Sequence, residues 1–255
     1  MKSLLLFFCI TILLNVSHAY AQMHMPVIDA PTIQQKTSYV IKYLGLDVGK
    51  IQLQHKENDS FYSITASIKS SGIVRIFSKQ KRTVALFGKK ANDQYIPLRY
   101  HAHVAYPHKE KTVSMLFDKG HIIRYDAIPE NDTILTDAQQ HAARDPLSVL
   151  LFFMQSAKNM PDVVFPITTI SFDGKRLNRI YALPAPKDES CVEASCATYA
   201  IFRKPLVGYS EKKLAKYRKG EPPVMVTMDT ENAYFPEKLH VNTSLGGLYI
   251  VPVKG

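Results

Sequence analysis

One apolar stretch interrupts a chain that otherwise alternates like β-strand. Residues 144–154 form the longest apolar run outside the N-terminus. Asp145 is a favourable helix N-cap, and Pro146 suits the first helical position, where a missing N–H costs nothing. The stretch therefore predicts the one main helix of the chain, ending at Pro161. Its predicted apolar face carries Leu147, Leu150, Leu151 and Met154.

Short segments with a period of two flank this helix on both sides. Residues 39–43 and 51–55 alternate around a turn at 45–49, and residues 113–117 and 121–125 form a second hairpin. After the helix, Asp173-Gly174 is a hairpin turn between two further strands. The polar segments 128–143 and 208–221 are expected to be loops, the second with a helical turn. Short strands joined by short turns predict a mainly β fold with local antiparallel pairing.

The N-terminus has the pattern of a secretory signal peptide. Lys2 precedes a mostly apolar segment from Leu4 to Val16, and Ala19-Tyr20-Ala21 is a small-x-small cleavage site. We expect cleavage after Ala21 and a periplasmic mature protein, since no later segment reaches the ~18 apolar residues of a membrane span. The predicted domains are a signal peptide at 1–21, a flexible leader at 22–37 and a single β-rich domain at 38–255.

The charge balance of the mature chain points to anionic partners. Without Lys2 the chain holds 31 Lys and Arg against 22 Asp and Glu, a net charge of +9. Such a charge attracts anionic surfaces over long range. In an exported protein the candidate partners are lipid or other anionic envelope components, or a periplasmic protein, rather than nucleic acid. A solvated surface without a specific partner explains the same scattered charges.

Two cysteines survive the predicted processing, Cys191 and Cys196. They are close together and lie in an oxidising compartment, so we expect a disulfide between them. The loop is short, which limits the entropic stabilisation to about 2 kcal/mol. The spacing Cys-x-x-x-x-Cys differs from the Cys-x-x-Cys of thiol oxidoreductases, so a redox role is not expected.

A series of short motifs, in chain order, resembles a known family. The series comprises the hairpin Tyr39-x-Ile41-x-Tyr43, Ser71-Gly72, Tyr95-x-Pro97, Asp145-Pro146-Leu147-Ser148, Phe172-Asp173-Gly174-Lys175, Gly208-Tyr209, Phe235-Pro236 and Gly246-Gly247. Over residues 38–252 it resembles the bacterial exported domain-of-unknown-function family 3108. The resemblance implies a strongly curled antiparallel sheet, an open or partial barrel, with one main helix against its concave side. The implied fold is similar to that of periplasmic lipoprotein carriers, and the resemblance brings no catalytic residues.

Few residue patterns suggest chemistry. His101-x-His103 places two imidazoles on one face of a strand, but zinc needs three or four ligands and no spaced set completes the site. If cleavage follows Ala21, His24 is the third residue, an arrangement that suits copper or nickel. Both metal sites stay open at this point. Gly-x-Ser-x-Gly and phosphate-binding glycine loops are absent from the sequence, so we expect no enzyme, no cofactor and no catalytic residues.

The sequence therefore predicts a non-enzymatic periplasmic protein that supports the cell envelope. A curled sheet lined by tyrosines and aliphatic residues would bind a lipid or another apolar ligand beneath the helix. The expected ligand-binding residues are Leu147, Leu150, Leu151, Met154, Tyr39 and Tyr43. The alternative is a periplasmic interaction or scaffold protein whose core is filled and which binds no small ligand.

Overall fold

A computed structural model describes residues 25–28, 30–72, 80–92, 94–159, 166–186, 196–218, 220, 222–229, 236–243 and 246–253. Within these ranges the strands form one sheet in which only the short β8–β9 pair is parallel. The strands are β1 (Ile33–Tyr43), β2 (Leu46–Glu57), β3 (Phe61–Ser70), β4 (Lys81–Ala91), β5 (Gln94–Tyr106), β6 (Lys109–Asp118), β7 (His121–Ile128), β8 (Ala143–Arg144), β9 (Ile167–Phe172), β10 (Leu177–Ala185), β11 (Cys196–Val207), β12 (Val224–Asp229), β13 (Lys238–Thr243) and β14 (Gly246–Pro252). The helices of the described residues are α3 (Asp137–Ala142), α4 (Pro146–Asn159) and α5 (Glu211–Arg218).

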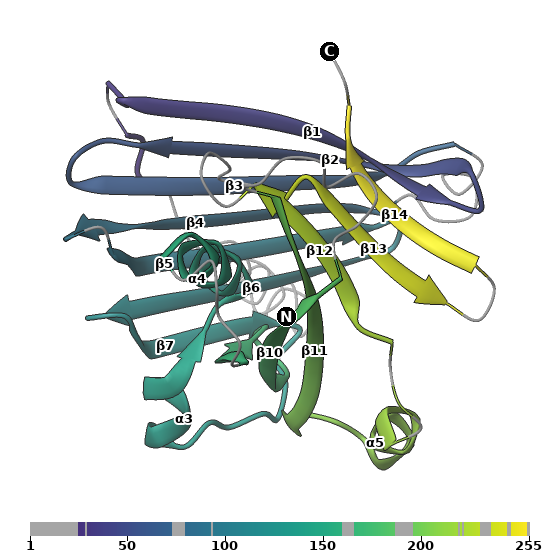
Figure 1. Cartoon of the computed structure of the whole chain (residues 1–255). Helices are drawn as coiled ribbons and strands as arrows, with labels where there is room; N and C mark the ends of the chain where they lie inside the picture. The colour runs from purple at the N-terminus through teal and green to yellow at the C-terminus, as the bar shows by residue number, and fades with distance from the viewer. Residues whose placement is uncertain are drawn as a thin grey trace, which may run out of the picture.

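The sheet curls into a nearly closed barrel. Its order is β7-β6-β5-β4-β3-β2-β1-β14-β13-β12-β11-β10-β9-β8, and the two edge strands β7 and β8 lie next to each other in space. Strand twist accumulates across a sheet of this size, and register shifts in four of the strand pairs increase it locally. Helix α4 lies inside the curve and packs against β9, β4 and β5 (Figure 1). The predicted fold class, a curled antiparallel sheet around one main helix, is confirmed.

Local turn chemistry fixes the pairing of neighbouring strands. The β1–β2 and β6–β7 turns each place two residues at positive φ, Leu44-Gly45 at 51° and 81° and Lys119-Gly120 at 49° and 83°. Two successive residues of this kind make the type I′ turn, whose twist matches that of the flanking strands. Both hairpins expected from the sequence are therefore present, with the first turn at 44–45 rather than across 45–49.

Helix α4 separates two hydrophobic cores. The larger core lies mainly between α4 and β2–β7 and consists of Tyr39, Leu53, Tyr62, Ile64, Ala66, Val84, Leu86, Tyr100, Ala102, Met115, Phe117, Ile122, Leu135, Ala143, Leu147, Leu151, Phe172 and Leu177. The smaller core lies between α4 and β10–β12 and consists of Val149, Phe153, Met154, Ala157, Ala182, Tyr199, Val226 and Met228. The expectation of a single apolar helix face was therefore wrong, because the curled sheet surrounds α4 and buries it on two sides.

Three segments have more regular structure than the sequence predicted. Strand β1 begins at Ile33, so residues 33–37 of the expected leader pair with β2. The expected loop at 128–143 contains α3, which begins with a capping box in which Thr136 and Gln139 exchange hydrogen bonds. The helical turn expected within 208–221 is α5, an eight-residue helix.

Several predictions fall on residues outside the described ranges. The signal peptide, its cleavage site and His24 lie there, and so do Pro161 and Cys191. Cys196 is buried at the start of β11, but its predicted pairing with Cys191 stays a prediction. Among the helices that the structure describes, none is both long and apolar enough to cross a membrane.

Candidate functional site

The start of α4 is held by a buried carboxylate. Asp145 is 0 % exposed, and its Oδ1 accepts hydrogen bonds of 2.9 Å from the backbone N–H groups of both Leu147 and Ser148. The Ser148 hydroxyl donates to Oδ2 at 2.5 Å. Burial raises the pKa of Asp145 to about 6, although these hydrogen bonds oppose the shift. The prediction that Asp145 caps the helix is confirmed.

A third side of α4 is mostly polar. Ser148, Gln155, Ser156 and Asn159 recur there at helical spacing, together with Phe152, which also packs against the smaller core. This side of α4 is one wall of a cleft of about 500 Å³. The cleft thus lies beside the helix, whereas the space between α4 and the strands is filled by the two cores.

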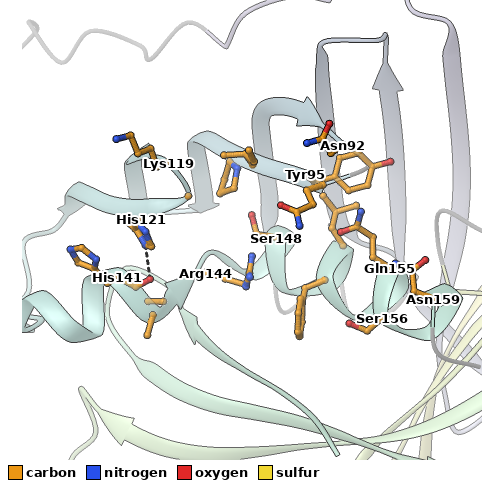
Figure 2. Close-up of a pocket in the computed structure, with 18 residues that line it drawn as sticks. Asn92, Tyr95, Lys119, His121, His141, Arg144, Ser148, Gln155, Ser156 and Asn159 are labelled. Carbon is orange, nitrogen blue, oxygen red and sulfur yellow. Dashed lines mark hydrogen bonds between the residues drawn. The ribbon is translucent and has the colours of Figure 1, made fainter. Parts of the chain in front are cut away.

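The other walls of the cleft come from three separate parts of the chain. They are the β4–β5 turn with the start of β5, the β6–β7 turn, and the segment joining α3 to α4 through β8. Figure 2 shows Asn92 and Tyr95 across from Gln155 and Asn159, with His121 and His141 at the other end. The described residues that line the cleft are Asn92, Gln94, Tyr95, Ile96, Pro97, Lys119, Gly120, His121, His141, Ala142, Ala143, Arg144, Ser148, Leu151, Phe152, Gln155, Ser156 and Asn159.

The cleft carries positive charge. Arg144 is half-buried, and its guanidinium carbon lies 4.9 Å from the centre of the Phe152 ring. Burial lowers the pKa of Arg144, and the neighbouring Asp145 carboxylate opposes this shift; an arginine remains a cation at neutral pH. Lys119 adds a second cation, and no Asp or Glu is among the described lining residues. The arrangement favours an anionic group placed near Arg144, in a site of reduced dielectric constant.

A buried charge cluster holds Tyr95 in place. The Tyr95 hydroxyl donates to Glu57 Oε2 at 2.7 Å, and Lys90 Nζ donates to Oε1 at 2.8 Å. Glu57 is 1 % exposed, and His55 Nε2 lies 3.2 Å from its Oε2. Burial alone would raise the pKa of Glu57, but the bonds from Lys90 and Tyr95 and the neighbouring charges bring it below its usual value. The hydrogen bond to Glu57 therefore fixes the position of the Tyr95 side chain, which lines the cleft.

Two histidines join the edges of the barrel at the end of the cleft. His121, at the start of β7, donates from Nδ1 to the backbone carbonyl of His141 in α3 at 2.8 Å. Their rings stack with centroids 4.5 Å apart. This contact spans the side of the molecule where β7 approaches β8, so it helps to close the barrel and to shape the cleft.

The residues expected to bind a ligand are spread over the molecule. Leu151 lines the cleft, while Leu147 and Tyr39 lie in the larger core, where the Tyr39 hydroxyl donates to the Pro236 carbonyl at 2.7 Å. Met154 lies in the smaller core, and Leu150 packs against it. Tyr43 is half-buried at the far end of β1, opposite Leu46 and Leu248. Their role in ligand binding stays a prediction.

The predicted histidine pair lies on the outer face of β5. His101 Nδ1 is 3.0 Å from Ser114 Oγ, and His103 Nε2 is 3.2 Å from Glu110 Oε2. Burial, and secondarily the charge of His103, lowers the pKa of His101. Within the described part of the chain, no group of three or more His, Cys, Asp or Glu side chains is placed to hold a metal.

Sequence reasoning did not identify the cleft. Its most informative signal was the polar stripe on an otherwise apolar helix, since Gln155 lies seven residues after Ser148, and Asn159 lies four residues after Gln155 and three after Ser156. The other walls lie in turns far apart in sequence, whose proximity depends on the closure of the sheet.

Comparisons with known proteins give a distant structural similarity. No family model matches the chain, and no curated protein matches it either. Among solved structures it is similar to a β-barrel-like protein of domain of unknown function DUF1849 from Brucella abortus, with a TM-score of 0.44 and 9 % sequence identity. The match covers 87 % of this chain and 95 % of that one. At this level no property of that protein is transferred, and the resemblance to family 3108 stays a prediction.

Proposed function

We propose that this protein is a non-enzymatic, exported binding protein whose cleft beside α4 takes an anionic amphiphile. The observation that carries the proposal is a cleft of about 500 Å³ with cations and without a carboxylate among its described lining residues. Its volume lies within the range of small-molecule sites, about 300–1,000 Å³. A fatty acid or a lipid with an anionic head group is the class of ligand that fits.

The two parts of such a ligand have separate partners in the cleft. A carboxylate or phosphate would pair with Arg144, the cation that is partly withdrawn from water. The apolar part would lie against Phe152, Leu151 and Ile96. The side-chain amide of Asn159 can donate hydrogen bonds to further ligand oxygens.

The proposed setting is the bacterial periplasm. It is supported by the signal-peptide pattern at residues 1–21 and by the resemblance to an exported family. The proposed disulfide between Cys191 and Cys196 belongs to the same oxidising compartment. Mass spectrometry of the protein recovered from a periplasmic extract tests this setting, since it should give an N-terminus at Gln22.

Ligand binding is tested with a fluorescent fatty acid that carries a dansyl group. The wild type should bind it, and native mass spectrometry of freshly purified protein should show a lipid-sized adduct. Arg144→Gln should weaken binding about tenfold, the loss of one charge-assisted contact. Ser156→Trp, which fills the cleft from the helix side, should abolish binding.

A matched control removes a cation elsewhere. Arg124 is 68 % exposed on β7 and pairs with Asp126, away from the cleft, so Arg124→Gln should leave binding unchanged. Thermal melting verifies that each variant is folded. If the wild type takes up no fatty acid, or if Arg144→Gln and Arg124→Gln weaken binding equally, the proposal is wrong.

The scaffold alternative has one observation in its favour. Both interior sides of α4 are packed against apolar side chains, which supports a filled core. Under this alternative the cleft would receive a side chain of a protein partner. This is tested by in-cell crosslinking with a photoreactive residue placed at position 159, and with the same residue at position 111 as a control. Position 159 should then crosslink to one protein partner, and position 111 should not.

A further inference from the structure

The β1–β2 turn exposes two leucines. Leu44 and Leu46 flank Gly45 and are each 61 % exposed. The turn lies at the opposite end of the barrel from the β4–β5 and β6–β7 turns that line the cleft (Figure 1). We call residues 44–46 the leucine tip.

The fold itself does not favour a leucine at this turn. Leu44 has φ +51° in a type I′ turn, a position that suits Asn or Gly and costs a leucine about 1 kcal/mol. Its side chain lies against Gly246, where an added Cβ would come within 2.3 Å of Leu44 Cδ2. That contact leaves most of the side chain in water, so burial within the chain offsets little of the cost.

Two opposed lysines lie further along the sheet from the tip. Lys50 on β2 is directly opposite Lys69 on β3, and both are exposed. Like charges in such a pair destabilise a sheet. Neither lysine forms an ion pair with any residue that the structure describes. Lys42 lies at the base of the tip, directly opposite the exposed Asp47 on β2, so that carboxylate offsets part of its charge. The repulsion between Lys50 and Lys69 would be relieved by an anionic surface.

An aromatic residue also lies near the base of the tip. Tyr249 on β14 is opposite Lys42 on β1 and is 37 % exposed. It stacks on His240 with ring centroids 4.3 Å apart, and Lys238 Nζ lies 5.8 Å from its ring centre. Tyrosine beside lysine, next to exposed aliphatic side chains, is the composition of a membrane–water interface.

We propose that the leucine tip docks the protein on an anionic phospholipid surface. Leu44 and Leu46 enter the boundary between head groups and acyl chains, and Lys42, Lys50 and Lys69 contact the phosphates. Aliphatic burial combined with basic residues is how peripheral proteins bind such surfaces. The docked orientation turns the cleft away from the bilayer. This docking stands independently of any ligand in the cleft.

Co-sedimentation with vesicles tests the proposal. The purified protein, its N-terminus verified by mass, is mixed with vesicles of phosphatidylglycerol and phosphatidylcholine, or of phosphatidylcholine alone. Binding should require phosphatidylglycerol and weaken as salt rises. The double variant Leu44→Asn/Leu46→Thr uses residues suited to a type I′ turn and to a strand, so it should fold. It should bind at least tenfold more weakly.

Two matched controls separate the tip from general surface properties. Ile123 on β7 is 62 % exposed, and Ile123→Thr should bind like the wild type. Lys50→Gln/Lys69→Gln should weaken binding about tenfold, while Lys89→Gln/Lys158→Gln, which removes two exposed lysines elsewhere, should have at most a threefold effect. If the wild type does not sediment with anionic vesicles, or if the leucine variant sediments as fully as Ile123→Thr, docking through the tip is wrong.

Discussion

The two sides of α4 differ in how they are packed. On the side of the larger core the interior also contains ionisable groups, with His55 at 0 %, Glu57 at 1 % and Asp145 at 0 % exposure. On the other side, Val149, Phe153, Met154 and Ala157 meet apolar side chains of β10–β12. A hydroxyl pair, Thr198 and Thr227 at 3.3 Å, is buried among those strands.

This difference between the two cores bears on both the stability of the fold and the position of the cleft. Apolar packing stabilises the fold without regard to pH, whereas a buried carboxylate costs free energy unless hydrogen bonds or cations compensate it. The buried carboxylates also contact residues that line the cleft. Asp145 accepts a hydrogen bond from Ser148, and Glu57 accepts one from Tyr95. The larger core therefore combines support of the fold with positioning of the cleft.

The largest expected effect is in the smaller core. Phe153 is 5 % exposed, and Phe153→Ala removes most of its side chain from a packed site. We expect a loss of about 3–5 kcal/mol in the free energy of unfolding, from lost burial and a residual cavity. Urea denaturation followed by circular dichroism measures it. The loss should be the same at pH 4 and pH 7, and a strong dependence on pH would contradict the apolar character of this side.

A smaller effect, with a pH dependence, is expected at Asp145. Its folded-state pKa of about 6 is above the ordinary value of 3.8, so the folded state binds the proton more tightly. The contribution of Asp145 to stability therefore falls as pH rises from about 4 to 6, by about 3 kcal/mol. Asp145→Asn should remove this decline. Denaturation curves at four pH values compare the two proteins, and parallel pH profiles would show that Asp145 does not carry the dependence.

The contribution of Glu57 to stability should change with pH in the opposite direction. Its folded-state pKa is lowered, so its ionised form stabilises the fold above pH 4.5, and this contribution is lost as pH falls through the folded pKa. Glu57→Gln should cost about 2 kcal/mol near neutral pH, where Lys90 loses its buried partner. The difference from the wild type should shrink in acid. A difference that grows in acid would be inconsistent with the Glu57–Lys90 pair.

The smallest effect is expected at the buried hydroxyl pair. Thr227→Val replaces one hydroxyl with a methyl group of similar size, and Thr227 is 3 % exposed. We expect a change of about 1 kcal/mol or less, without pH dependence, because one neutral hydrogen bond has a modest net contribution. The same denaturation assay measures it. A loss comparable to that of Phe153→Ala would mean that this side, too, depends on polar contacts.

The sequence alone determined the local structure. Asp145 and Pro146 located the start of α4, and the alternating segments located the strands and most hairpin turns. The capping box at Thr136 was present in the sequence, but the polar composition of 128–143 led to a loop being expected. These features depend on neighbouring residues, so the sequence contains them directly.

The tertiary structure decided which side of each element faces which neighbour. An apolar helix pattern cannot distinguish one covering sheet from a sheet that surrounds the helix, so Leu147 and Met154, expected on one face, lie in different cores. The cleft joins Asn92, Lys119, Arg144 and Asn159 only because the sheet curls until β7 approaches β8. That closure results from twist summed over the whole sheet, which no local window of sequence contains.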